Sequence, residues 1–176
     1  KQCAITVLTE RDPQFELPVD ERFMAGIHGK VLLHSPELRK GMSESLALLG
    51  SHAEVLVNCS QNKSEATALL ATREILSPAD WVLWGSLNNL LPILAEAVPD
   101  EFLSAIEAAI QQLPCPFDEL FSQEGGGITG ANYLTGLLWA LEGVAWDQTY
   151  LVRVCVILGS LASHDPGGKC ANRPAN

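Results

Sequence analysis

Four residues near the C-terminus, His164, Asp165, Cys170 and Arg173, are of the types that bind metals or assist catalysis. A zinc site in this segment would need about four ligands at helical or knuckle spacing. The segment supplies one histidine and one cysteine, with five residues between them. The run from Asp165 to Gly168 (Asp-Pro-Gly-Gly) is instead typical of a tight turn. We therefore predict a turn here, with no metal and no cofactor.

The run Gly167-Gly168-Lys169-Cys170 resembles the end of a phosphate-binding loop. That loop requires a further glycine at position 163, Ser or Thr directly after the lysine, and a preceding strand. Positions 163 and 170 hold Ser and Cys, and no strand pattern precedes them. These departures argue against nucleotide binding. The Gly-x-Ser-x-Gly and His-Glu-x-x-His motifs of hydrolases are also missing from the sequence.

An enzymatic interpretation stays open as the alternative. Its site would lie between the glycine-rich loop 122–130 and the loop 164–173. A deep pocket lined by Asp165, Lys169 and Arg173 would support an enzyme. A groove or an apolar strip without such converging side chains would support a binding protein, and a purely structural spacer would expose no large apolar patch.

The charge of the chain is unevenly distributed. Of its 176 residues, 21 are acidic and 11 are Lys or Arg, so the formal net charge is −10. Residues 74–152 contain 11 acids and no Lys or Arg. Because phosphate groups are bound by clustered Lys and Arg, this block argues against nucleic acid and against an anionic membrane surface as partners.

The apolar segments are too short or too interrupted for a transmembrane helix, and residues 1–10 do not resemble a signal peptide. The five cysteines are odd in number and widely spaced, which favours a reducing, cytoplasmic location. The sequence begins with Lys1, and we expect the chain to be a piece of a larger protein.

The elements that would position these residues are helices, because apolar residues recur at helical spacing throughout. One stripe is Leu87, Leu90, Leu91, Leu94 and Val98. Further stripes begin near residues 38, 66, 102, 134 and 150. Pro92 falls inside the first stripe, where it would kink the helix or mark its start.

Two helical segments match each other. The four leucines of 87–94 recur in 134–141, at an offset of 47 residues, and each segment runs through an aspartate into a second helix. This spacing is typical of HEAT and armadillo units, which are about 40–47 residues long. We predict an all-α fold of two-helix repeats, with matched units at about 81–113 and 130–163. These would form either a short right-handed α-solenoid or an irregular helical bundle.

The predicted organisation has two parts. Residues 1–35 form an N-terminal helical segment that continues from a missing upstream part, and residues 36–176 form the helical-repeat module. The four tryptophans could form a ligand-stacking site, but all lie in or beside apolar patterns. We therefore interpret Trp81, Trp84, Trp139 and Trp146 as core and inter-helix packing residues.

Five further segments carry a resemblance to known proteins: Leu38–Leu49, Leu90–Leu103, Gly136–Glu142, Asp165–Gly168 and Asn172–Pro174. They resemble the helical-repeat C-terminal regions of large bacterial proteins, among them STAND-type NTPases of anti-phage defence. The resemblance implies a sensor or scaffold region, with nucleotide-binding and effector domains outside this chain. It transfers no catalytic residue.

The acidic block gives the last hypothesis. Six of its acids are expected at helix starts, where they stabilise the helix dipole: Asp80, Asp100, Glu101, Asp118, Glu119 and Asp147. Glu96 and Glu142 instead occupy equivalent positions near helix C-termini, where an anion is disfavoured. We expect them to point toward one shared face, balanced by Arg153 or by groups outside the chain.

The sequence thus favours a non-catalytic interaction or scaffold module of a larger cytoplasmic bacterial protein. Its partner would be another protein or an adjacent domain of the same polypeptide. Candidate partner-binding residues are Glu96, Glu142, Glu124, Asp165, Lys169 and Arg173.

Overall fold

The computed structural model describes residues 1–56, 63–123, 132–168 and 172–174. Within these residues, all regular secondary structure is helical, as the apolar periodicity predicts. The α-helices are α1 (Gln2–Leu8), α2 (Pro36–Ser51), α3 (Lys63–Leu76), α4 (Trp81–Ser86), α5 (Leu91–Ala97), α6 (Pro99–Ile110), α7 (Pro116–Ser122), α8 (Thr135–Ala145) and α9 (Gln148–His164). Short 3-10 helices are η1 (Pro13–Glu16), η2 (Arg22–Met24), η3 (Ala53–Val55) and η4 (Asn88–Leu90).

Local capping sets where several helices begin. Ser35 precedes Pro36 at the start of α2, and its hydroxyl accepts a hydrogen bond from the backbone N–H of Leu38. Asp80 caps α4 and Asp147 caps α9 in the same way. These caps satisfy backbone donors that have no partner inside the helix, so they stabilise helix starts at these residues.

Pro92 does not kink a long helix. The chain instead breaks into α4, η4 and α5, and Pro92 lies in the first turn of α5, where its missing N–H costs no intrahelical hydrogen bond. Of the two interpretations of this proline, the one in which a helix starts beside it is correct.

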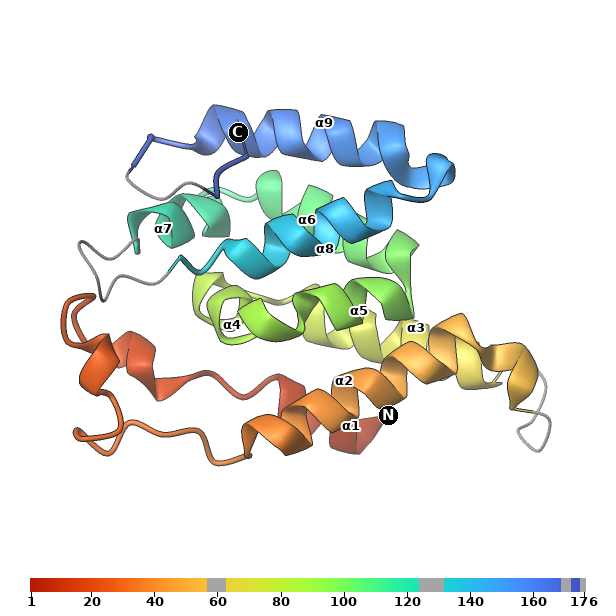
Figure 1. Ribbon diagram of the computed structural model, residues 1–176, viewed down its shortest axis with the longest axis horizontal. Coiled ribbons are helices and arrows are strands. Elements are labelled where there is room, and N and C mark those ends of the chain that lie inside the picture. Colours follow the sequence, from red (N-terminus) through yellow and green to blue (C-terminus); the bar gives the residue numbers. More distant parts are fainter. Residues whose placement is uncertain (57–62, 124–131, 169–171, 175–176) are drawn as a thin grey trace.

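The longer helices pack as antiparallel pairs in two layers. Helices α2, α5 and α8 lie side by side in one layer (Figure 1), and α3, α6 and α9 contact one another in that order to form the other. Each helix of the first layer also contacts one helix of the second layer, so the pairs are α2 with α3, α5 with α6, and α8 with α9. The two matched sequence segments are therefore adjacent pairs in the stack. This arrangement is a helical bundle.

Two glycines allow neighbouring segments of the first layer to touch through their backbones. A Cβ atom placed on Gly136 of α8 would lie 1.6 Å from the carbonyl oxygen of Asn88. A Cβ atom on Gly50 of α2 would lie 1.8 Å from the carbonyl oxygen of Ala97. Both distances are far below any real contact, so only glycine fits at these crossings.

A single apolar core runs between the layers. Leucines of the matched stripes are buried there, including Leu87, Leu91 and Leu94 from one and Leu137 and Leu141 from the other. Burial of such stripes is the main force that holds the layers together.

The tryptophans divide between core and surface. Trp84 is fully buried and packs its ring against Phe117, and Trp81 is half-buried against Phe15. Trp139 is 59% exposed and Trp146 is 83% exposed, so neither is a core residue, and the prediction that all four tryptophans are core or inter-helix packing residues fails for Trp146. Trp139 lies on α8 and Trp146 directly follows this helix.

Residues 1–35 contain α1, η1 and η2, and α1 packs on both α2 and α3. The segment therefore shares the core of the rest of the chain. Its buried Arg22 lies over the rings of Phe15 and Tyr133 and donates a hydrogen bond to the side chain of Gln123. In the described part of the chain, no helix combines the length and apolarity needed to cross a bilayer.

Candidate functional site

An open groove lies between α5, the start of α6, and α8. It has a volume of about 340 Å³ and is mainly apolar. We call it the α5–α8 groove, and it is lined by Pro92, Ala95, Glu96, Pro99, Trp139, Ala140, Gly143, Val144, Asp147 and Tyr150. The groove is open above Ala140 and Gly143 because these residues have small or no side chains. The side chains of Pro92, Pro99 and Trp139 form its walls.

Trp139 is the largest apolar side chain of the groove, and more than half of it is open to solvent. Tryptophan is the side chain most often found at the energetic centre of protein interfaces, because it buries a large apolar area and loses few degrees of freedom. The only charged residues that line this groove are Glu96 and Asp147. The groove is thus apolar with an acidic edge.

The cation nearest to the groove in sequence, Arg153, is already engaged. Its guanidinium binds both carboxylate oxygens of Glu107, at 2.7 and 2.8 Å, and also contacts Asp100 at 3.2 Å. These hydrogen bonds lower the pKa of Glu107 and raise that of Arg153. The expectation that Arg153 balances Glu96 or Glu142 is therefore wrong, because Glu107 lies opposite it on the adjacent helix.

Other acids of the block 74–152 also find partners from outside it. Glu74 pairs with Lys1, and Glu101 accepts two hydrogen bonds from Arg73, which lower the pKa of Glu101. Glu96 and Glu142 differ: both are exposed, and neither has an ion-pair partner among the described residues.

Glu96 lines the α5–α8 groove, whereas Glu142 does not. On α8 the groove-facing residues are Trp139, Ala140, Gly143 and Val144, and Glu142 is not among them. The shared acidic face of Glu96 and Glu142 stays a prediction. The acid that does line the groove beside Glu96 is Asp147, the N-cap of α9.

Two of the remaining candidate residues, Asp165 and Arg173, lie beyond the C-terminal end of α9. Asp165 and Arg173 form an ion pair with each other, and their side chains are only 6% and 10% exposed. The cavity that Arg173 lines together with Asn132 and Asn172 has a volume of about 10 Å³. Glu124 and Lys169 lie outside the described residues. In the described part, Asp165 and Arg173 thus hold the C-terminal segment in place.

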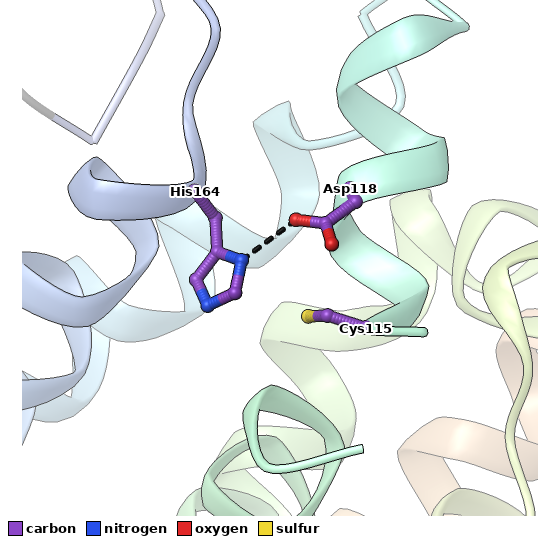
Figure 2. Close-up of side chains that lie close together, drawn as sticks. All are labelled: Cys115, Asp118 and His164. Carbon is purple, nitrogen blue, oxygen red and sulfur yellow. Dashed lines mark hydrogen bonds and ion pairs between the residues drawn. The ribbon is translucent and has the colours of Figure 1, made fainter. Parts of the chain in front are cut away.

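A second group of chemically capable side chains forms where the N-terminus of α7 meets the C-terminus of α9. Cys115, Asp118 and His164 offer donor atoms that all lie within 4.8 Å of one another. Figure 2 shows the three side chains converging, with Nδ1 of His164 2.7 Å from a carboxylate oxygen of Asp118. We call this group the Cys–Asp–His cluster.

The cluster joins residues of different exposure. Cys115 is 2% exposed, and burial raises the pKa of its thiol, an effect that the backbone amides of Phe117 and Asp118 partly offset. Cys115 and Asp118 also line an open cavity of about 660 Å³ with Asp80 and Trp81. The sequence offered one signal of this group, the i, i+3 spacing of Cys115 and Asp118, but no signal that places His164 beside them.

A third, more polar cavity of about 460 Å³ lies beside the N-terminal segment. Arg39 lines it and is 2% exposed. Its guanidinium donates to the backbone carbonyl of Ser86 at 3.1 Å, and burial lowers its pKa. This arginine ties α2 to the end of α4.

Comparison of the chain with protein families, with curated proteins and with solved structures gives no match.

Proposed function

We propose that this chain is a non-catalytic helical interaction module that binds a basic, amphipathic helical segment of a protein partner in the α5–α8 groove. The observation that carries the proposal is an exposed Trp139 in an apolar groove whose only charged lining residues are acidic. A helix laid into such a groove would present apolar side chains to its floor and Lys or Arg to its edge.

Charge supports this occupant over others. Glu96 has no partner in the described chain, and the block 74–152 contains no Lys or Arg. Arg153, which follows the block, is held by Glu107 and Asp100. An acidic segment would therefore meet uncompensated repulsion, while a basic one would supply the missing countercharges.

The layered pairing supports the finer proposal of a short α-solenoid of two-helix units, α2–α3, α5–α6 and α8–α9. In such a stack, neighbouring units bury each other's apolar stripes and leave a continuous surface for a partner. With the resemblance to repeat regions of STAND-type bacterial proteins, this would make the chain a cytoplasmic sensor or scaffold region. The basic segment would then belong to another protein or to an adjacent domain.

The test uses two fluorescently labelled peptides of equal length. One is an amphipathic helix of leucine and lysine, and the other has glutamate in place of every lysine. We expect fluorescence anisotropy to show binding of the lysine peptide only. Trp139→Ala should weaken binding at least about tenfold, and Glu96→Gln should weaken it less.

The matched control is Trp146→Ala, since Trp146 is also exposed but does not line the groove. It should bind the lysine peptide as the wild type does. If Trp139→Ala and Trp146→Ala lost the same affinity for the lysine peptide, the binding would be non-specific adhesion and the proposal would be overturned. It would also be overturned if the glutamate peptide bound as tightly as the lysine peptide.

A further inference from the structure

We propose that Cys115, Asp118 and His164 form a binding site for a zinc ion, with a fourth coordination position open toward the adjacent cavity. The site is independent of the α5–α8 groove and uses none of its residues. The chemical argument starts from the donor set: a thiolate, an imidazole nitrogen and a carboxylate oxygen are the three ligand types that zinc takes in proteins.

The distances suit a small tetrahedral ion. In tetrahedral geometry, zinc bonds of about 2.0–2.3 Å place neighbouring donor atoms about 3.3–3.8 Å apart. The donor atoms of the cluster lie within 4.8 Å of one another, so side-chain rotations would bring them to the ion. Nδ1 of His164 and the carboxylate oxygen of Asp118, now 2.7 Å apart, would exchange their hydrogen bond for bonds to zinc and separate by about 0.6 Å. The exposed Asp118 and the half-exposed His164 have the freedom to rotate, while the buried Cys115 is fixed.

The fold positions these ligands by two rigid elements. Cys115 is the N-cap of α7 and Asp118 lies one turn later, which places both on the same side of that helix start. His164 is the last residue of α9, a helix of 17 residues. The carbonyl end of α9 carries partial negative charge, which favours a cation at this position.

An open fourth position follows from the surroundings. The cavity of about 660 Å³ that Cys115 and Asp118 line has room for a water ligand. Its other carboxylates are engaged: Asp80 caps α4 and pairs with Arg11, and Glu119 accepts a hydrogen bond from the side chain of Gln123 at 2.5 Å. Three protein ligands and a water are typical of zinc sites that are accessible to further ligands.

The simplest alternative is that His164 and Asp118 form an ordinary surface ion pair. Such a pair would contribute at most about 1 kcal/mol and would not involve the thiol. In the zinc site the sulfur of Cys115 binds the metal, whereas in the ion pair it has no role. The absorption spectrum of bound Co²⁺ distinguishes the two interpretations. Co²⁺ bound to a thiolate shows a charge-transfer absorption band in the near ultraviolet and visible bands typical of tetrahedral geometry.

The experiment uses the whole chain, purified with a chelator and a phosphine reductant and then freed of both. Titration with Co²⁺ should produce the thiolate band and saturate at one ion per chain, and Zn²⁺ should displace the cobalt. In Cys115→Ser the band should vanish. Asp118→Asn and His164→Gln should each raise the Kd for Zn²⁺ at least about tenfold.

Cys155→Ser is the matched control, because Cys155 is an exposed cysteine on α9 outside the cluster. It should keep the band and the affinity. Circular dichroism in the absence of metal verifies that each variant is folded, and Asp118→Asn, at an exposed position, serves as the test should Cys115→Ser unfold. The proposal would be overturned if the thiolate band persisted in Cys115→Ser or disappeared in Cys155→Ser. It would also be overturned if Asp118→Asn and His164→Gln bound Zn²⁺ with unchanged affinity.

Discussion

Gly136 offers the sharpest test of the packing between the two matched helix pairs. It lies in the first turn of α8, and its backbone N–H donates a hydrogen bond of 2.8 Å to the side-chain oxygen of Asn88. In Gly136→Ala, the new Cβ would lie 1.6 Å from the backbone oxygen of Asn88 and 2.5 Å from its carbonyl carbon. The clash is with backbone atoms, so no side-chain rotation relieves it.

The expected cost follows from the displacement. Real Cβ atoms essentially never come within 3.0 Å of another heavy atom, so α8 would have to move by about 1.4 Å from η4. Overpacking of this kind costs about 1–3 kcal/mol or more, and loss of the Asn88 hydrogen bond adds about 1 kcal/mol. The higher helix propensity of alanine offsets at most about 1 kcal/mol. Because the clash is with backbone atoms, we take the upper end of the overpacking range and expect Gly136→Ala to lower the free energy of unfolding by about 3 kcal/mol.

Gly143 and Gly41 are the matched controls. Gly143 lies in the same helix and Gly41 lies within α2, and a Cβ atom at either position would meet nothing within 4 Å. Alanine at these positions should stabilise the protein by up to about 1 kcal/mol, because it restricts the unfolded chain and favours the helix.

Urea denaturation followed by far-ultraviolet circular dichroism measures these differences. With an m value of about 2 kcal/mol/M, Gly136→Ala should lower the urea midpoint by about 1.5 M, and the two control variants should leave it unchanged or raise it. If Gly136→Ala were as stable as Gly143→Ala, the close backbone contact between α8 and η4 would be refuted, and with it the side-by-side arrangement of the matched pairs.

Two further predictions concern side chains that tertiary structure brings together. Since hydrogen bonds from Arg153 lower the pKa of Glu107 below its ordinary value of 4.5, this pair should stabilise the fold fully above about pH 4.5. The contribution should be lost as the pH falls through the lowered, folded-state value. Urea midpoints should therefore fall more steeply with acidification in the wild type than in Arg153→Met, and parallel pH profiles would contradict the pairing. The buried Cys115 should resist alkylation by iodoacetamide in the metal-free native protein, while the exposed Cys155 reacts readily. Peptide mass mapping measures the extent of alkylation at each cysteine. If Cys115 and Cys155 were alkylated equally in the native protein, Cys115 would be accessible and the prediction would be wrong.

The helices and many of their boundaries could be predicted from the sequence because short-range chemistry decides them. Asp80 and Asp147 cap helices at the predicted positions, since the side chain and the N–H groups it satisfies are neighbours in sequence. The leucine stripes identify the buried faces for the same reason. The matched segments are indeed adjacent pairs, although the sequence alone did not distinguish a solenoid from an irregular bundle.

The candidate sites were harder to predict, because they depend on which helices become neighbours. Asp165 and Arg173 were predicted as partner-binding residues, and the sequence did not indicate that they form an ion pair with each other. Trp139 lies among the leucines of 134–141 and was interpreted as a packing residue, but it is exposed in a groove between α5 and α8. Periodicity identifies an apolar face but not whether another element covers it.

Local interactions thus determined this protein's helices, their caps and their apolar faces, and the composition alone determined its acidic character. Tertiary structure decided the rest. It brought Arg153 into an ion pair with Glu107, 46 residues away, and it placed His164 beside Cys115 and Asp118. The physical reason is that ion pairs and donor clusters act over a few ångströms in space, and the sequence does not state which distant residues the packing of the core will bring that close.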